Sequence, residues 1–121
     1  MALKILFIIN TALCLFRGTG FTFAPTNLWK PFNVNLDHGT AFPVQLLGAA
    51  YFATAFMNMS AINFIEKSEV QSVLIFNVTI EIIGTILTLR GISSNRIGKL
   101  GWTPFAVHLF LALSFGYFLL Y

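Results

Sequence analysis

The chain has 121 residues, of which 57% are hydrophobic and 9% are charged. A soluble domain carries about 25% charged residues, and one of this length leaves roughly a third of its chain surface in water, so this composition excludes an ordinary soluble domain. Seven basic and four acidic residues give a formal net charge of +3, and such a sparse, dispersed charge excludes a nucleic-acid partner. The sequence therefore predicts an all-α integral membrane protein, a single domain over residues 1–121 built as a four-helix bundle.

The first predicted transmembrane span covers residues 2–23 and holds the single cysteine, Cys14. A basic residue, here Lys4, before a short apolar core is also typical of a secretory signal peptide. We expect a retained helix instead, because Arg17 interrupts the segment, apolar residues resume after it, and no small-x-small cleavage site follows.

Residues 25–40 are predicted to form a surface loop, because Pro25 and Pro31 interrupt regular structure there. Trp29 lies beside Lys30 in this segment. Aromatic and basic neighbours of this kind are typical of the lipid headgroup level, so we expect the loop to lie on the membrane surface.

The second predicted span covers residues 42–65, with Pro43 in its first turn, where its missing N–H costs nothing. Small residues let membrane helices approach each other closely. The residues that we expect to serve this packing role are Gly48, Ala49 and Ala53 here and Gly84 in the third span.

The third and fourth predicted spans cover residues 70–89 and 102–121. Trp102 begins the fourth span and Tyr121 ends it. Aromatic side chains at both ends of a span are expected at the two membrane interfaces.

Basic residues in short loops predict the orientation of a membrane protein, because they favour the cytoplasmic side. The loops after the first and third spans contain four basic residues, whereas the opposite side contains two. We therefore expect both termini to lie outside the cell and those two loops to be cytoplasmic.

Three ionisable side chains fall inside the predicted spans, where a charge costs at least ~2.5–3.5 kcal/mol on insertion scales. Glu81 lies near the middle of the third span, Arg17 in the cytoplasmic half of the first, and His108 about two turns inside the fourth. With a rise of about 1.5 Å per residue, their heights differ by less than about 10 Å. A Glu81–Arg17 ion pair with His108 alongside is therefore one arrangement that the spacing permits, either as a structural pair or as a ligand or proton site.

Polar residues also recur along single helix faces. Asn77 and Glu81 share one face of the third span with Gly84 and Thr88, at spacings of four and three residues. We expect such faces to line the bundle interior, and the candidate site residues are Glu81, Arg17, His108, Asn77, Asn58 and Tyr51. The alternative interpretation is that the amides hold the helices together, at ~0.6 kcal/mol per hydrogen bond on average.

Two stretches carry a resemblance to a known group. One begins with Gln45-Leu46-Leu47-Gly48-Ala49-Ala50 and runs to Asn58; the other begins with Gly101-Trp102 and includes His108 to Leu113 and Phe115-Gly116-Tyr117. In layout the chain resembles small bacterial four-helix membrane proteins of the DoxX-like type. The resemblance implies a four-helix membrane fold and a location in the bacterial inner membrane, and it implies no specific activity.

No enzyme, phosphate-loop or metal-ligand motif appears in the sequence, so we expect a non-enzymatic protein without catalytic residues, metal or cofactor. Besides membrane lipid, the expected partner is a small lipophilic ligand, another copy of the chain or a partner membrane protein. One alternative is a small proton-coupled transporter using Glu81. The chain is similar in size and helix count to the small multidrug resistance transporters, but their essential glutamate lies in the first helix. Another alternative is an accessory subunit that docks through the small residues of the second span.

Overall fold

The computed structural model describes residues 1–64 and 66–121, and all regular structure in these ranges is helical. The long helices are α1 (Ala2–Phe23), α3 (His38–Ala61), α4 (Lys67–Ser93) and α5 (Trp102–Leu120). The short elements are α2 (Pro25–Trp29) and the 3-10 helices η1 (Lys30–Phe32) and η2 (Lys99–Gly101).

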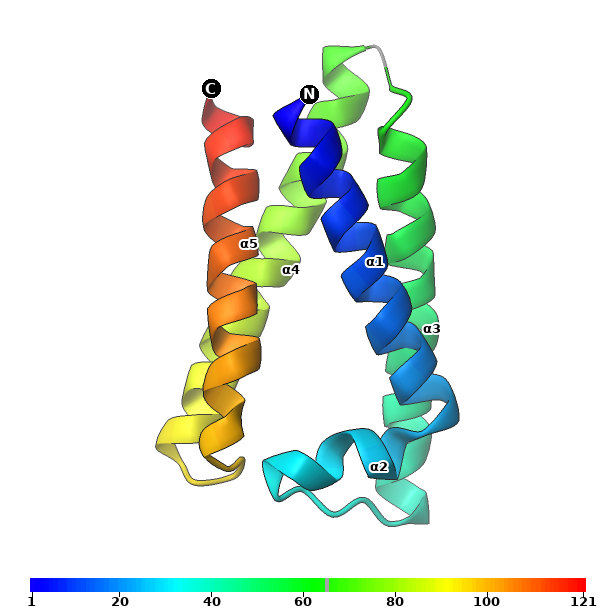
Figure 1. The fold of residues 1–121 in the computed structure, drawn as a ribbon, viewed down its shortest axis with the longest axis vertical. Coiled ribbons are helices and arrows are strands. Elements are labelled where there is room, and N and C mark those ends of the chain that lie inside the picture. Colours follow the sequence, from blue (N-terminus) through cyan, green and yellow to red (C-terminus); the bar gives the residue numbers. More distant parts are fainter. Residues whose placement is uncertain (65) are drawn as a thin grey trace.

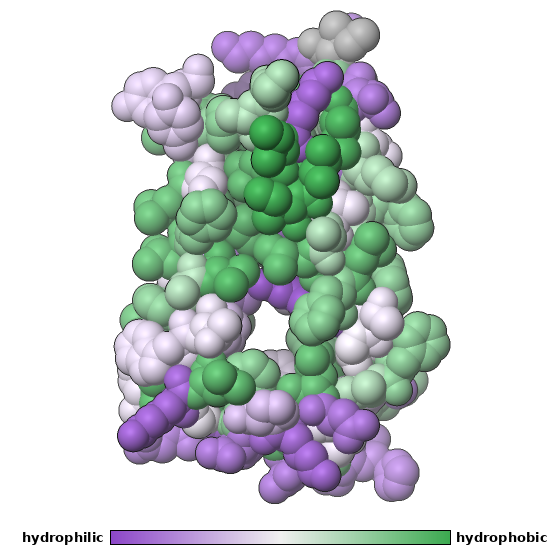
Figure 2. Space-filling model, in the orientation of Figure 1, coloured by the Kyte–Doolittle hydropathy of each residue, from purple (hydrophilic) through white to green (hydrophobic). Residues whose placement is uncertain are grey.

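All four long helices are long and apolar enough to cross a membrane. Figure 2 shows apolar side chains over the middle of the molecule and hydrophilic ones concentrated at its two ends. The prediction of an all-α bundle with four membrane-spanning helices is therefore confirmed.

The helix boundaries differ from the predicted spans at two helices. α4 begins three residues before the predicted span 70–89 and ends four residues after it, and α3 begins four residues before the predicted span 42–65 and ends at Ala61. This helix begins at His38, inside the segment predicted as a loop, because Asp37 and Thr40 form a capping box. The Thr40 N–H donates to the Asp37 carboxylate at 2.8 Å, and the Asp37 N–H donates to the Thr40 hydroxyl at 3.0 Å. The Thr40 hydroxyl also donates to the Asp37 carboxylate at 2.8 Å, and the two hydrogen bonds that this carboxylate accepts from Thr40 hold the pKa of Asp37 below its usual value. The predicted end of this span, Ile65, lies outside the described residues.

Much of the predicted surface loop is also helical. Pro25 occupies the first turn of α2, where a backbone N–H has no partner within the helix, so the N–H that proline lacks is not missed. Asn33 ends η1 in the left-handed conformation, with a φ of 59°, which Asn tolerates better than most residues. The segment α2–η1 crosses the end of the bundle that is opposite the two termini (Figure 1).

The long helices are arranged as two pairs, α1 with α3 and α4 with α5 (Figure 1). The pairs converge at the end that holds both termini and diverge toward the other end. The converging end contains a buried apolar core that includes Leu6, Phe7, Leu74, Leu111 and Phe115. The rings of Phe7 and Phe115 lie 5.9 Å apart and join α1 to α5.

Glycine lies at the contact between α1 and α3. A Cβ atom on Gly48 would lie 2.9 Å from the backbone nitrogen of Thr22 and 3.0 Å from the carbonyl oxygen of Gly18, and it would also overlap the Thr22 hydroxyl. Because two of these neighbours are backbone atoms, the helices themselves must separate to accept any side chain at Gly48.

We predict that Gly48→Ala lowers the free energy of unfolding by about 1–3 kcal/mol, the usual cost of overpacking. Gly116→Ala is the matched control, since a Cβ atom on this helical glycine meets nothing within 4 Å; it should leave stability unchanged or raise it by up to about 1 kcal/mol. Unfolding in mixed micelles with increasing SDS measures both. Equal stability of the two variants would contradict the close α1–α3 contact.

Candidate functional site

Three buried asparagines join α1, α3 and α4 just below the apolar core. Asn10 donates to the side-chain oxygen of Asn77 at 3.2 Å. Asn77 and Asn58 exchange two hydrogen bonds, at 2.8 and 3.3 Å. Each of the three side chains is at most 1% exposed, so their amides satisfy one another where no water reaches them.

A second buried polar contact joins α4 to α5. The Glu81 carboxylate oxygen lies 2.6 Å from Nδ1 of His108, and the two residues are 2% and 9% exposed. One proton lies between these atoms, whichever of them carries it. The bond fixes the orientation of the imidazole ring and leaves its other nitrogen, Nε2, for a further partner.

Gly84 makes room for this pair. It lies almost one turn beyond Glu81 on α4, and a Cβ atom there would lie 2.6 Å from Nδ1 of His108. The ring therefore rests directly against the α4 backbone. Gly84 and Gly48 both lie at close helix contacts, whereas Ala49 and Ala53 are exposed on the outer side of α3 and do not pack inside the bundle.

Arg17 lies over an aromatic ring. Its guanidinium carbon is 5.5 Å from the centroid of the Tyr51 ring, a cation–π geometry. Within residues 1–64 and 66–121, the carboxylate of Glu81 pairs with His108 and not with Arg17. Nη1 of Arg17 is buried and has no acceptor in the part of the chain that the structure describes.

Where the helix pairs diverge, an open cavity of about 590 Å³ lies between them. Figure 2 shows an opening through the molecule in this half. Its walls are mainly apolar side chains, among them Leu13, Leu47, Ile80, Leu87 and Val107. Of the six predicted site residues, Arg17, Tyr51 and His108 line it. The structure places the other three, Glu81, Asn77 and Asn58, in the buried contacts described above.

Aromatic residues cover the cavity toward the α2 end. Phe21 stacks on Trp29 with ring centroids 5.7 Å apart and meets the edge of Tyr51 at 5.3 Å. Trp29 also contacts Phe32 at 5.8 Å. The sequence reasoning missed Phe21, Trp29 and Phe32 as cavity residues; their clustering around the end of the first span was the available signal.

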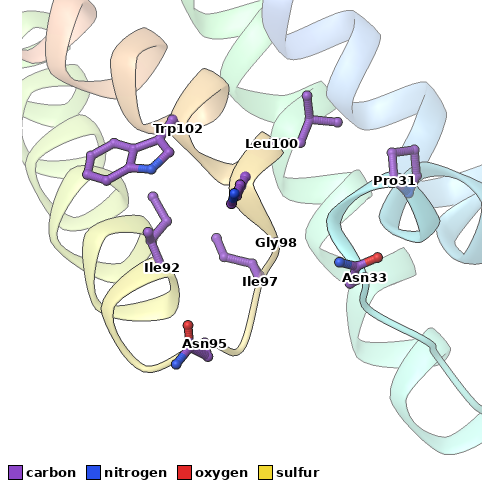
Figure 3. A pocket seen from close by; sticks show the side chains of 9 residues that line it. Pro31, Asn33, Ile92, Asn95, Ile97, Gly98, Leu100 and Trp102 are labelled. Carbon is purple, nitrogen blue, oxygen red and sulfur yellow. The ribbon is translucent and has the colours of Figure 1, made fainter.

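A second cavity, of about 620 Å³, lies between the two loops at the diverging end. Figure 3 shows Pro31 and Asn33 on one side of it, facing Ile92, Ile97 and Trp102 on the other. The Gly98 N–H donates to the carbonyl of Phe32 at 2.8 Å and so joins these loops. Because this space lies at the helix ends, where the chain meets the headgroups, the cavity at membrane depth is the stronger candidate site.

Among the described residues, no three His, Cys, Asp or Glu side chains gather closely enough to hold a metal ion. Glu81 and His108 form a pair without a third ligand.

Comparisons with known proteins give no relative. The chain matches no protein-family model, no curated protein and no solved structure. The DoxX-like resemblance therefore stays a prediction.

We predict that Asn77→Ala lowers the free energy of unfolding by about 2 kcal/mol, because it removes three interhelical hydrogen bonds. Thr79→Ala is the control. Thr79 is exposed and bonds to a carbonyl of its own helix, so its loss should change stability by less than about 0.5 kcal/mol. SDS titration in mixed micelles measures both, and an Asn77→Ala variant as stable as the control would show that the amides contribute nothing.

We also predict that Gly84→Ala displaces the imidazole from Glu81 and costs about 1–3 kcal/mol through overpacking. The ¹⁵N chemical shifts of the His108 ring in labelled protein report the hydrogen bond directly. Gly116→Ala, on the same helix as His108, serves as the control. Unchanged ring shifts in Gly84→Ala would rule out the contact between the ring and the α4 backbone.

Proposed function

We propose that the protein is a non-enzymatic membrane protein that binds a small lipophilic molecule in the cavity between its two helix pairs. The cavity itself carries this proposal. Its volume of about 590 Å³ falls in the range of ~300–1,000 Å³ that is usual for small-molecule sites. Apolar walls with a few convergent polar groups are also the usual composition of such sites.

The placement of the cavity favours a lipophilic ligand over a water-soluble one. It lies between helices whose outward side chains are apolar and long enough to cross the hydrocarbon. The opening between the helix pairs (Figure 2) faces that same apolar belt. A molecule dissolved in the membrane can therefore enter sideways without crossing water.

The alternatives find less support. In a proton-coupled transporter the essential carboxylate must exchange protons or substrate, but Glu81 is 2% exposed and lies behind His108, outside the cavity lining. An accessory subunit that docks through small residues is favoured by one observation, the exposure of Ala49 and Ala53. The variants below separate this role from ligand binding.

We propose that the protein lies in the inner membrane of a bacterium. In the orientation that we propose, both termini are on the outer side of that membrane. Both termini, the end of α3 and the beginning of α4 lie at one end of the molecule (Figure 1). The diverging end carries Lys30, Arg90, Arg96 and Lys99. The excess of basic residues at that end supports a cytoplasmic location for it.

Two neighbouring alanines on α3 provide a matched test. Ala50 lines the cavity, whereas Ala49 does not. We predict that Ala50→Phe lowers the affinity for the ligand about 5- to 100-fold, because steric overlap costs about 1–3 kcal/mol and ~1.4 kcal/mol equals one decade of affinity. Ala49→Phe should leave occupancy unchanged.

Mass spectrometry of lipophilic molecules that co-purify with each variant, relative to bulk lipid, measures the occupancy. Heating the protein with added ligand gives a second readout, since ligand at 100 times its Kd stabilises the folded state by about 2.7 kcal/mol. Equal occupancy in the two variants would contradict a ligand in this cavity. Loss of a stoichiometric partner protein from Ala49→Phe alone would favour the accessory role.

A further inference from the structure

We infer that the ligand is a single-chain amphiphile with an anionic head, a carboxylate or a phosphate, whose head pairs with Arg17. This inference rests on the proposed function and names the chemical class of its ligand. Four independent features of the described residues support it: an arginine without a counter-ion, an indole N–H without an acceptor, the charge around the diverging end, and the size of the cavity.

The first feature is the uncompensated charge of Arg17. Its guanidinium lines the cavity at membrane depth, and it has no carboxylate within salt-bridge distance in the part of the chain described. The face of Tyr51 compensates the charge only in part, and Nη1 has no acceptor. An arginine held inside a membrane protein is usually paired, and its planar fork suits a carboxylate or phosphate, so the missing partner is an anion.

The second feature is an indole N–H without an acceptor. Trp29 lines the same cavity, and its indole nitrogen, which can only donate, has no acceptor among the described residues. A ligand head that accepts hydrogen bonds matches this lining better than one that donates them.

The third feature is the charge at the diverging end, where the cavity lies. Lys30, Arg90, Arg96 and Lys99 are found there, against a single carboxylate, Asp37, in the described segments of that end. A positive field raises the local concentration of anionic molecules and attracts anionic lipid heads. An anionic amphiphile is therefore attracted to the membrane surface at the diverging end, which is the surface closest to Arg17.

The fourth feature is size. At about 30 Å³ for each water-sized group, the cavity of about 590 Å³ takes roughly twenty such groups. That is enough for one long acyl chain with its head and too little for a phospholipid with two chains. The apolar walls accommodate the chain, and Arg17 receives the head.

The test compares three probes of equal chain length: palmitate, hexadecyl phosphate and hexadecanol. Each is titrated against the full-length protein in nanodiscs of zwitterionic lipid, with native mass spectrometry as the readout. We expect wild type to bind at least one of the two anions about tenfold tighter than the alcohol, the effect of a charge-assisted hydrogen bond. The ratio between the two anions identifies the head.

Arg17→Gln should remove this preference while leaving hexadecanol affinity within about twofold, because the chain still contacts the same walls. Arg90→Gln is the control, since Arg90 is a basic residue of the same end that lies outside the cavity lining; it should keep the preference. A preference that survives in Arg17→Gln would overturn the role of Arg17.

The wild-type measurement stands even where a variant fails to fold. Equal affinity of wild type for the anions and the alcohol would overturn the anionic head and leave the proposed function intact. Binding of none of the three, together with equal co-purified lipophile in Ala50→Phe and Ala49→Phe, would overturn both.

Discussion

The structure depends on the partners that α4 finds for its buried polar side chains. In hydrocarbon, helices gain no hydrophobic stabilisation from meeting each other, so close packing and interhelical hydrogen bonds decide which of them associate. Asn77 and Glu81 lie one turn apart on α4 and serve different neighbours. Asn77 bonds to α1 and α3 through the amides, and Glu81 bonds to α5 through His108. Asn77 thus joins the two helix pairs, and Glu81 holds α4 and α5 together within one pair.

The cavity follows from where those contacts lie. The apolar core and the polar contacts hold the pairs together toward the end with the termini (Figure 1). Beyond Gly84 the pairs diverge, and the next connection between them is the backbone hydrogen bond from Gly98 to Phe32 in the loops. Space is left between these two connections, and α2 with its aromatic neighbours covers its end. A bundle joined at both ends and open between them is well suited to holding a molecule from the membrane.

The sequence predicted the four spans and the inward face of the third helix because both depend on periodicity and hydropathy along a single segment. It did not predict the partner of Glu81. The rise per residue gives the height of Arg17 and His108 in the membrane, but not the rotation of each helix or which helices are neighbours. Because α4 packs on α5, His108 reaches Glu81, and Arg17 lies over Tyr51 on α3. Trp29 was placed at the headgroups by its neighbours in sequence, whereas α2 carries it into the cavity wall.

The depth of an ionisable residue in the membrane therefore does not distinguish a residue that holds helices together from a residue that lines the cavity. By depth alone Glu81 is the strongest candidate, yet its carboxylate is buried in a bond that joins two helices. Arg17 lies nearer a helix end and lines the cavity without a carboxylate partner among the described residues. His108 alone belongs to both groups, since it holds Glu81 and lines the cavity. A molecule in the cavity would contact, through this ring, the α4–α5 connection that holds one of the two helix pairs together.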